Sequence, residues 1–218
     1  MADGSLGVST GKGAGKGGRT AARIREAALE LFSRLGFERA TLGEIAAAAG
    51  VSQANLHYHY QDKDALWRAA MLDLRGVIAE EERLLEAAAD ASALTQLRMA
   101  MRLFLKISWK HPALGRIVAL EGMAGGERLD WLVDHLLGPR NRRLAQLVQA
   151  AIEAGELKAF PPEQLVITLQ AAGAGLINLT PLMAANFGVD TGDPAVREAH
   201  DSMILDALLG GLVNDKKR

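Results

Sequence analysis

The chain of 218 residues contains no cysteine. Disulfide bonds, catalysis by a thiolate and a zinc site built on cysteines are therefore excluded, and the composition is compatible with a reducing cytoplasm. An excess of one charge is also lacking, because 25 Lys and Arg face 26 Asp and Glu. The first 68 residues nevertheless hold nine basic residues against seven acidic ones. If the chain binds a polyanion, we expect its N-terminal part to do so.

Long apolar runs are scarce. The N-terminal sequence MADGSLGVSTGKGAGKGGRT lacks the apolar core of a secretory signal, so we predict a cytoplasmic protein. Only the stretch 164–189 is uncharged over a length that could span a bilayer. Polar residues interrupt this stretch and no Lys or Arg lies close to its ends, which favours a helix buried by protein and predicts no membrane partner.

Signals for β-strands are also weak. β-Branched residues are sparse, and apolar and polar residues never alternate over the length of a strand, so the predicted fold class is all-α. Residues 1–19 are rich in Gly and carry Lys12, Lys16 and Arg19, which predicts a flexible basic arm. Within the arm, residues 13–18 formally satisfy G-x-G-x-x-G. We reject a dinucleotide site there, because no strand precedes these glycines and no βαβ pattern follows.

Helix signals begin at Thr20. Residues with capping side chains stand at the four expected helix starts: Thr20, Thr41, Ser52 and Asp62. Thr41 also forms a capping box with Glu44, while Gly36 and Gly50 stand where the first two helices should end. Further helices are expected over residues 92–110, 112–123, 127–154 with a break or kink near Gly138-Pro139, 162–187 and 194–213.

The segment from Leu42 to His59 combines a short helix, a tight turn at Gly50 and a second short helix. This is the layout of a helix-turn-helix. Ala46 is small where the two helices must approach each other, and apolar residues stand where the pair must pack onto the first helix: Ile45, Val51 and Leu56. An incidental pair of packed helices would share several of these features, so the motif alone leaves that alternative open.

Residues 23–67, RIREAALELFSRLGFERATLGEIAAAAGVSQANLHYHYQDKDALW, follow the pattern aAlelF...Gf..aT...Ia..aGvs...ly.hf..Kd.L almost from end to end. In this they resemble the DNA-binding domain of the TetR family of transcriptional regulators. The remainder has the length of that family's ligand-binding and dimerisation domain. After the basic arm over 1–19, the resemblance thus implies an N-terminal three-helix helix-turn-helix domain over 20–66 and a larger C-terminal helical domain for effector binding and dimerisation over 67–218.

The resemblance also implies roles for single residues. Four fall where the family's recognition helix faces base edges in the major groove: Gln53, Ala54, Asn55 and His57. Three fall where the family holds phosphates: Thr41, Tyr58 and Lys63. The chemistry agrees, because Gln and Asn can pair with adenine through two hydrogen bonds and Ala can contact a thymine methyl group.

The sequence differs from the family pattern at two aromatic positions. The family commonly has Tyr where this chain has His57, and Phe where it has Tyr60, so the contact made by His57 stays open between base, phosphate and neither. We expect His59 and Tyr60 to pack against neighbouring helices. His57 and His59 lie two apart, on different faces of a helix and without a carboxylate at ligand spacing, so we expect neither a metal site nor another cofactor.

In the C-terminal part the resemblance implies an apolar pocket with a few polar groups that orient a small-molecule effector. We predict four lining residues: Trp109, Trp131, His135 and Asn178. The family usually dimerises through its final two helices. Small and leucine-rich segments in 171–175 and 201–213 are suited to such an interface, so we expect a homodimer.

These features together predict a DNA-binding transcriptional regulator. The favoured form is a ligand-responsive repressor that binds a palindromic double-stranded DNA operator as a dimer and is released by an effector. No nucleophile with a base and no metal constellation supports an enzyme. Two alternatives remain: a small-molecule-binding protein or enzyme with a vestigial helix-turn-helix, and a transcriptional activator.

Overall fold

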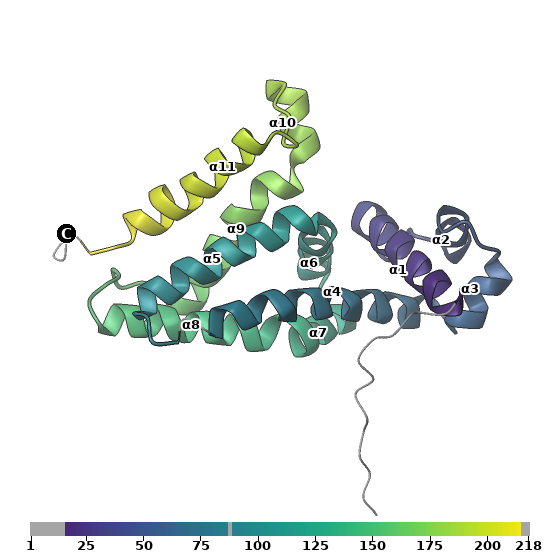
Figure 1. Ribbon diagram of the computed structural model, residues 1–218, viewed down its shortest axis with the longest axis horizontal. Helices are drawn as coiled ribbons and strands as arrows, with labels where there is room; N and C mark the ends of the chain where they lie inside the picture. The colour runs from purple at the N-terminus through teal and green to yellow at the C-terminus, as the bar shows by residue number, and fades with distance from the viewer. Residues whose placement is uncertain (1–15, 87–88, 215–218) are drawn as a thin grey trace, which may run out of the picture. The chain divides into compact units, whose positions relative to one another are not determined.

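A computed structural model describes residues 16–86 and 89–214 (Figure 1). Within these ranges the chain is helical, and its only β-type pairing is an isolated antiparallel bridge between Leu157 and Val213. The predicted all-α fold is therefore confirmed. The chain divides into two compact units, with the division after Ala70, four residues beyond the predicted domain boundary.

The first unit contains α1 (Lys16–Leu35), α2 (Leu42–Ala48), α3 (Gln53–His59) and the beginning of α4 (Lys63–Glu86). Ile24, Ala28 and Phe32 recur every four residues along α1 and are buried, so one stripe of this helix faces the small core. The helix begins at Lys16, whereas the sequence predicted a start at Thr20 and a flexible arm up to residue 19. Propensity is a weak guide here, because a packed helix can continue outward through Gly17 and Gly18 at a cost of about 1 kcal/mol each. The rest of the predicted arm lies outside the described residues.

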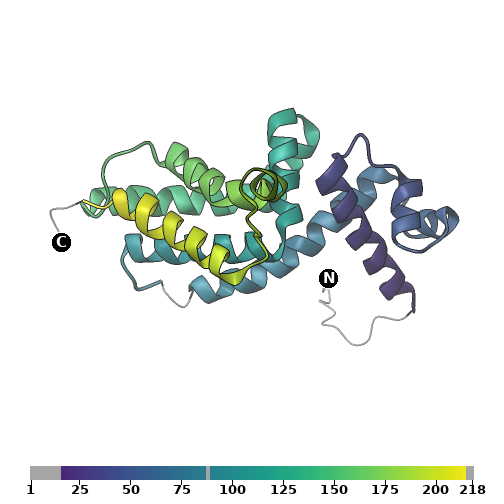
Figure 2. The same cartoon turned by 90° about the horizontal axis from the view of Figure 1, so that it is seen from above.

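The second unit begins within α4 and is a bundle of helices (Figure 2). Ser92 caps the first helix after α4 by accepting a hydrogen bond from the Thr95 N–H, and proline stands in the first turn of several others. The elements are α5 (Ala93–Lys110), α6 (Pro112–Ala124), α7 (Glu127–Leu132), the π-helix η1 (Val133–Leu137), α8 (Gly138–Glu153), α9 (Pro162–Asn178), α10 (Thr180–Phe187), α11 (Pro194–Ser202) and the π-helix η2 (Met203–Leu209).

The break or kink predicted near Gly138-Pro139 takes the form of a π-helical turn. The winding widens over Val133–Leu137 and returns to α-helix at Gly138. A Cβ atom at Gly138 would lie 2.6 Å from the Val133 carbonyl oxygen, so a glycine is required where the widened turn closes. Pro139, which has no N–H to offer the preceding turn, then opens α8.

The single helix predicted over residues 162–187 is wrong, because α9 ends at Asn178 and α10 begins at Thr180. Pro181 explains the break. Its ring would clash with the carbonyl of Ile177 in a continuous helix, and the Thr180 hydroxyl donates to that carbonyl at 3.0 Å instead. No single helix in the described ranges is long and apolar enough to cross a membrane; only α9 and α10 together have the length and composition, and they are bent by 60°.

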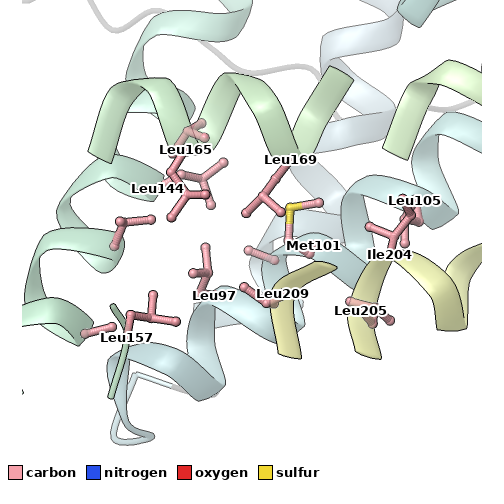
Figure 3. Packing of buried hydrophobic residues seen from close by; sticks show 14 residues of the cluster. Leu97, Met101, Leu105, Leu144, Leu157, Leu165, Leu169, Ile204, Leu205 and Leu209 are labelled. Carbon is pink, nitrogen blue, oxygen red and sulfur yellow. The ribbon is translucent and has the colours of Figure 1, made fainter. Parts of the chain in front are cut away.

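The core of the second unit consists of apolar side chains from α5, α8, α9 and η2, and most of them are leucines (Figure 3). On α9 the buried residues are Leu165, Val166 and Leu169, whereas Ile167 on the other side is exposed. On η2 the buried residues are Ile204, Leu205 and Leu209, whereas Met203 and Leu208 are exposed. Both helices therefore carry apolar side chains on two faces, of which one is covered within the described part of the chain.

Candidate nucleic-acid interface

The turn between α2 and α3 is fixed by local hydrogen bonds. The Thr41 hydroxyl accepts from the Glu44 N–H at 3.2 Å, and the Glu44 carboxylate accepts from the Thr41 N–H at 3.0 Å, which confirms the capping box. The Thr41 hydroxyl also donates to the Glu44 carboxylate at 2.7 Å, and this bond, followed by the one from the Thr41 N–H, lowers the pKa of Glu44 below its ordinary value. The capping box therefore stabilises α2 above the ordinary pKa of a glutamate and loses that effect as the pH falls through the lowered one.

The end of α2 follows the predicted pattern. Gly50 has a φ of 63°, its N–H donates to the Ala47 carbonyl, and the next N–H donates to the Ala46 carbonyl. This pair of bonds requires a residue that adopts the left-handed conformation without strain, hence glycine. Ser52 then caps α3 by accepting from the Asn55 N–H at 3.1 Å. The two helices thus meet in a rigid turn, as a helix-turn-helix requires.

The recognition helix α3 is anchored by Leu56, its one fully buried residue. The five predicted DNA contacts on this helix are all exposed: Gln53, Ala54, Asn55, His57 and Tyr58. Tyr58 has 85% of its surface exposed. A short helix that buries one leucine and exposes amide, imidazole and phenol groups has the size and chemistry to enter a major groove.

Lys63 is placed differently from the other predicted contacts. Its ammonium group donates to the carbonyls of Phe37, Glu38 and Ala40 at 2.8, 3.3 and 3.2 Å and lies 4.3 Å from the centre of the Phe37 ring. An ammonium group has three N–H donors, so these bonds occupy all of them. Lys63 therefore holds the turn between α1 and α2, a role that the sequence did not predict. Thr41, at the start of α2, is exposed as well as engaged in its cap.

Of the two rings at the end of α3, Tyr60 packs against a neighbouring helix as expected, whereas the ring contacts of His59 are with Tyr58 and Tyr60 beside it in the chain. His59 is half-buried, and Tyr60 is buried with 9% of its surface exposed. The Tyr60 hydroxyl accepts from Arg25 at 2.9 Å and donates to the Ala21 carbonyl at 3.3 Å. Tyr60 thus ties the end of α3 to α1, which a phenylalanine at this position could not do.

The predicted effector-lining residues fall into separate groups. Trp131 and His135 stack with ring centres 4.4 Å apart, and His135 is exposed. Trp109 is half-buried and donates to the Asp201 carboxylate at 2.9 Å. The side-chain oxygen of Asn178 is buried beside Gly115 of α6 and accepts no hydrogen bond from the described residues.

The sequence did not single out His200. It is buried with 5% of its surface exposed, its ring meets Trp109 edge to face at 5.7 Å, and its Nε2 atom lies 2.8 Å from the Gly173 carbonyl oxygen. Its Nδ1 atom is buried and has no hydrogen-bond partner among the described residues. The contact with Gly173 spans 27 positions, which no local pattern predicts.

A helix-turn-helix joined by chain to a larger helical unit defines the class of DNA-binding regulators with a second, sensory domain. Two family models match the chain: "Bacterial regulatory proteins, tetR family" over residues 24–70, and "Tetracyclin repressor-like, C-terminal domain" over residues 94–208. The first match lies in the first unit and the second in the second unit. The chain therefore belongs to the TetR family of transcriptional regulators, as its N-terminal resemblance predicted.

Curated relatives and solved structures agree with this assignment. The HTH-type transcriptional regulator RutR of Escherichia coli K12 is 28% identical over 174 residues, 78% of this chain and 79% of RutR. The nucleoid occlusion factor SlmA of Photobacterium profundum is 27% identical over 83% of this chain and 90% of SlmA. The hemolysin II regulator HlyIIR shares the fold with a TM-score of 0.69 at 17% identity, covering 92% of this chain and 100% of HlyIIR. The ketosteroid regulator KstR2 of Mycobacterium tuberculosis shares it with a TM-score of 0.72 at 16% identity, covering 89% and 95%.

Proposed function

We propose that this regulator is a ligand-responsive repressor that binds a palindromic operator as a homodimer. The observation that supports it most directly is the exposed face of α3, held on a rigid helix-turn-helix. In a two-fold dimer, two such helices enter successive major grooves about one helical turn apart. The matched domains and relatives are those of transcriptional regulators and not of enzymes.

Gln53 and Asn55 are the proposed base-reading residues, with Ala54 and His57 beside them, and Tyr58 is a proposed phosphate contact. Amide side chains can offer a donor and an acceptor to the edge of one adenine, which makes their contacts specific for sequence. A phenol hydroxyl donates to phosphate oxygens on any sequence. Thr41, exposed at the start of α2, suits the second role.

Replacing Gln53 and Asn55 with alanine, one at a time, is expected to lower affinity for the operator about 5- to 100-fold per half-site, since a paired base contact contributes about 1–3 kcal/mol. Affinity for a random duplex should change little. Fluorescence anisotropy with both duplexes at one salt concentration measures this. Tyr58→Phe is the matched control, expected to weaken both duplexes alike by removing a phosphate contact. Equal losses on both duplexes for Asn55→Ala would contradict base reading by this residue.

The effector is proposed to bind in the second unit near Trp109 and Asn178. Asn178 Oδ1 and His200 Nδ1 are two buried acceptors without partners in the described ranges. In the neutral form of His200, the nitrogen that faces the Gly173 carbonyl carries the proton, and Nδ1 is then an acceptor. Because an unmet buried acceptor costs about 1–3 kcal/mol, a ligand with N–H or O–H groups would gain affinity by meeting these atoms. Trp131 and His135 are proposed as a stacked pair at the rim.

This proposal makes a prediction about effector chemistry. Among compounds that release the protein from DNA in a gel shift, N- or O-methylation of the donor group is expected to weaken release about tenfold or more, since the buried acceptors would again be unmet. Asn178→Leu should remove the preference between a compound and its methylated form. A preference that survives in both Asn178→Leu and His200→Leu would place the effector elsewhere.

Effector binding would act by population shift. A ligand that binds better to a conformation with the wrong spacing between the two recognition helices lowers DNA affinity by the ratio of its affinities for the two states. Helix α4 is the proposed link, because it begins directly after α3 and continues into the second unit.

A further inference from the structure

Helix α1 holds α3 at both of its ends. Before α3, Arg23 Nη2 donates to the carbonyls of Ala49 and Gly50, which form the turn of the helix-turn-helix. After α3, Arg25 and the Ala21 carbonyl bind the hydroxyl of Tyr60, the residue that ends the helix. These α1 residues all lie within five positions of each other, so one short piece of α1 brackets the recognition helix.

The apolar anchoring between these two points is small. Leu56 is the one residue of α3 that is fully buried, and a helix of seven residues with a single buried leucine can pivot about that contact. Polar contacts at the two ends remove this freedom, because each fixes one end of the helix against the same rigid neighbour. Base contacts depend on such positioning, whereas phosphate contacts tolerate displacement.

Arg23 is fitted closely to the turn. A Cβ atom at Gly50 would lie 2.8 Å from Arg23 Nη2, so the guanidinium occupies the space that the glycine leaves open. Arg25 and Tyr60 are 35 positions apart and Arg23 and Ala49 are 26 apart. The contacts therefore depend on the folded unit and are absent from either helix alone.

We propose that Arg23, Arg25 and the Tyr60 hydroxyl are positioning residues for operator recognition, which set the ratio of specific to non-specific DNA affinity without contacting bases. This inference rests on the proposed role of α3 in reading DNA. It assigns a function to Tyr60 that its burial alone does not require, because the phenylalanine common in the family would fill the same space.

The test uses the full chain and two probes: the tightest duplex that the wild-type protein selects from a random library, and a random duplex of equal length. Tyr60→Phe, which changes no charge, is expected to lower affinity for the selected duplex about fivefold per half-site, the equivalent of one hydrogen bond, and to leave the random duplex within twofold. Arg25→Met and Arg23→Met should lower the same ratio. Arg34→Met is the matched control, because Arg34 lies on α1, pairs with Glu30 and is exposed.

A double variant distinguishes a shared contact from two separate effects. If Arg25 and Tyr60 act through their mutual hydrogen bond, Arg25→Met combined with Tyr60→Phe should lower the ratio no further than the larger single change. Strictly additive losses would overturn that part of the proposal. All measurements are made at least 15 °C below each variant's unfolding temperature, since a purely structural role would lower that temperature and leave the ratio unchanged.

The salt dependence of binding separates positioning from direct contact. If either arginine touches a phosphate, its replacement should lower the slope of log affinity against log salt by about one and weaken both duplexes. That result would overturn the proposal, and so would an unchanged ratio of selected to random duplex affinity in Tyr60→Phe. The Gln53 and Asn55 variants would still test base reading independently. A wild-type protein that selects no sequence from the library would overturn the proposed function itself.

Discussion

Glutamate in place of both Met203 and Leu208 is expected to make the protein monomeric and to lower its operator affinity about 100-fold or more, the range by which bivalent binding exceeds a single contact. Both side chains lie on η2 and are exposed, by 53% and 41%, on the side away from the core. The exposed Ile167 and Ala171 stand four apart on the neighbouring helix α9. Among the described residues, α9 and η2 thus each carry exposed apolar side chains, and these are the ones that we expect to form the dimer interface.

The expected effect is large because of symmetry. In a two-fold interface each substitution occurs twice, so four carboxylates would lie in one apolar contact. Burial of an unpaired charge costs several kcal/mol, and like charges add repulsion. A monomer keeps its recognition helix but binds a single half-site, which removes the gain from simultaneous binding.

Light scattering at micromolar concentration measures the mass, and anisotropy measures affinity for the full operator and for one half-site. The matched control is Leu120→Glu with Met123→Glu, two exposed apolar residues on α6 of the same unit. It should leave mass and operator affinity unchanged. A dimeric Met203→Glu, Leu208→Glu protein would show that the interface lies elsewhere, and a monomer with full operator affinity would show that dimerisation is not required for binding.

The helix-turn-helix could be predicted from the sequence because its signals are local. The capping box of Thr41 and Glu44, the turn at Gly50 and the cap at Ser52 each depend on residues within five positions, and the structure contains all three. The residue types and their spacing are enough to predict caps and turns of this kind. The start of α1 at Lys16 was missed because Gly17 and Gly18 in its first turn disfavour a helix.

The sequence could not predict contacts between distant positions. Lys63 meets carbonyls 23 to 26 positions away, and Trp109 meets Asp201 across 92 positions. Which polar atom a buried side chain meets depends on how the helices pack, and one sequence does not encode that in a local pattern. Trp131 and His135 drew attention as large rings on apolar helices, whereas the structure shows the two rings stacked on each other, with Trp131 half-buried and His135 exposed.

Lys63→Met is expected to destabilise the first unit by about 3 kcal/mol, since hydrogen bonds to a charged donor contribute about 1.5–3 kcal/mol each and do not add fully. Methionine keeps the apolar stem beside Phe37 but offers no donor to the three carbonyls of the turn. These carbonyls belong to the connection that sets α2 against α1. Their loss of a partner should therefore loosen the whole helix-turn-helix.

Hydrogen exchange of backbone amides measures this unit by unit. Amides in α1 to α3 should exchange about 100-fold faster in Lys63→Met, the equivalent of about 3 kcal/mol, while those of α5, α8 and α9 keep their protection. Arg68→Met provides the control, because it removes one positive charge from an exposed position on the same helix. Unchanged protection in α1 to α3 would contradict the structural role of Lys63.

The same variant tests the role that the family resemblance implied for Lys63. If Lys63 binds a phosphate, replacing it should lower the slope of log DNA affinity against log salt by about one and leave the stability of the fold almost unchanged. A lysine whose three donors are taken by backbone carbonyls does the reverse: stability falls, and the salt slope measured on the folded fraction stays the same. Because the two roles predict opposite pairs of results, one protein and two measurements decide between phosphate contact and turn support.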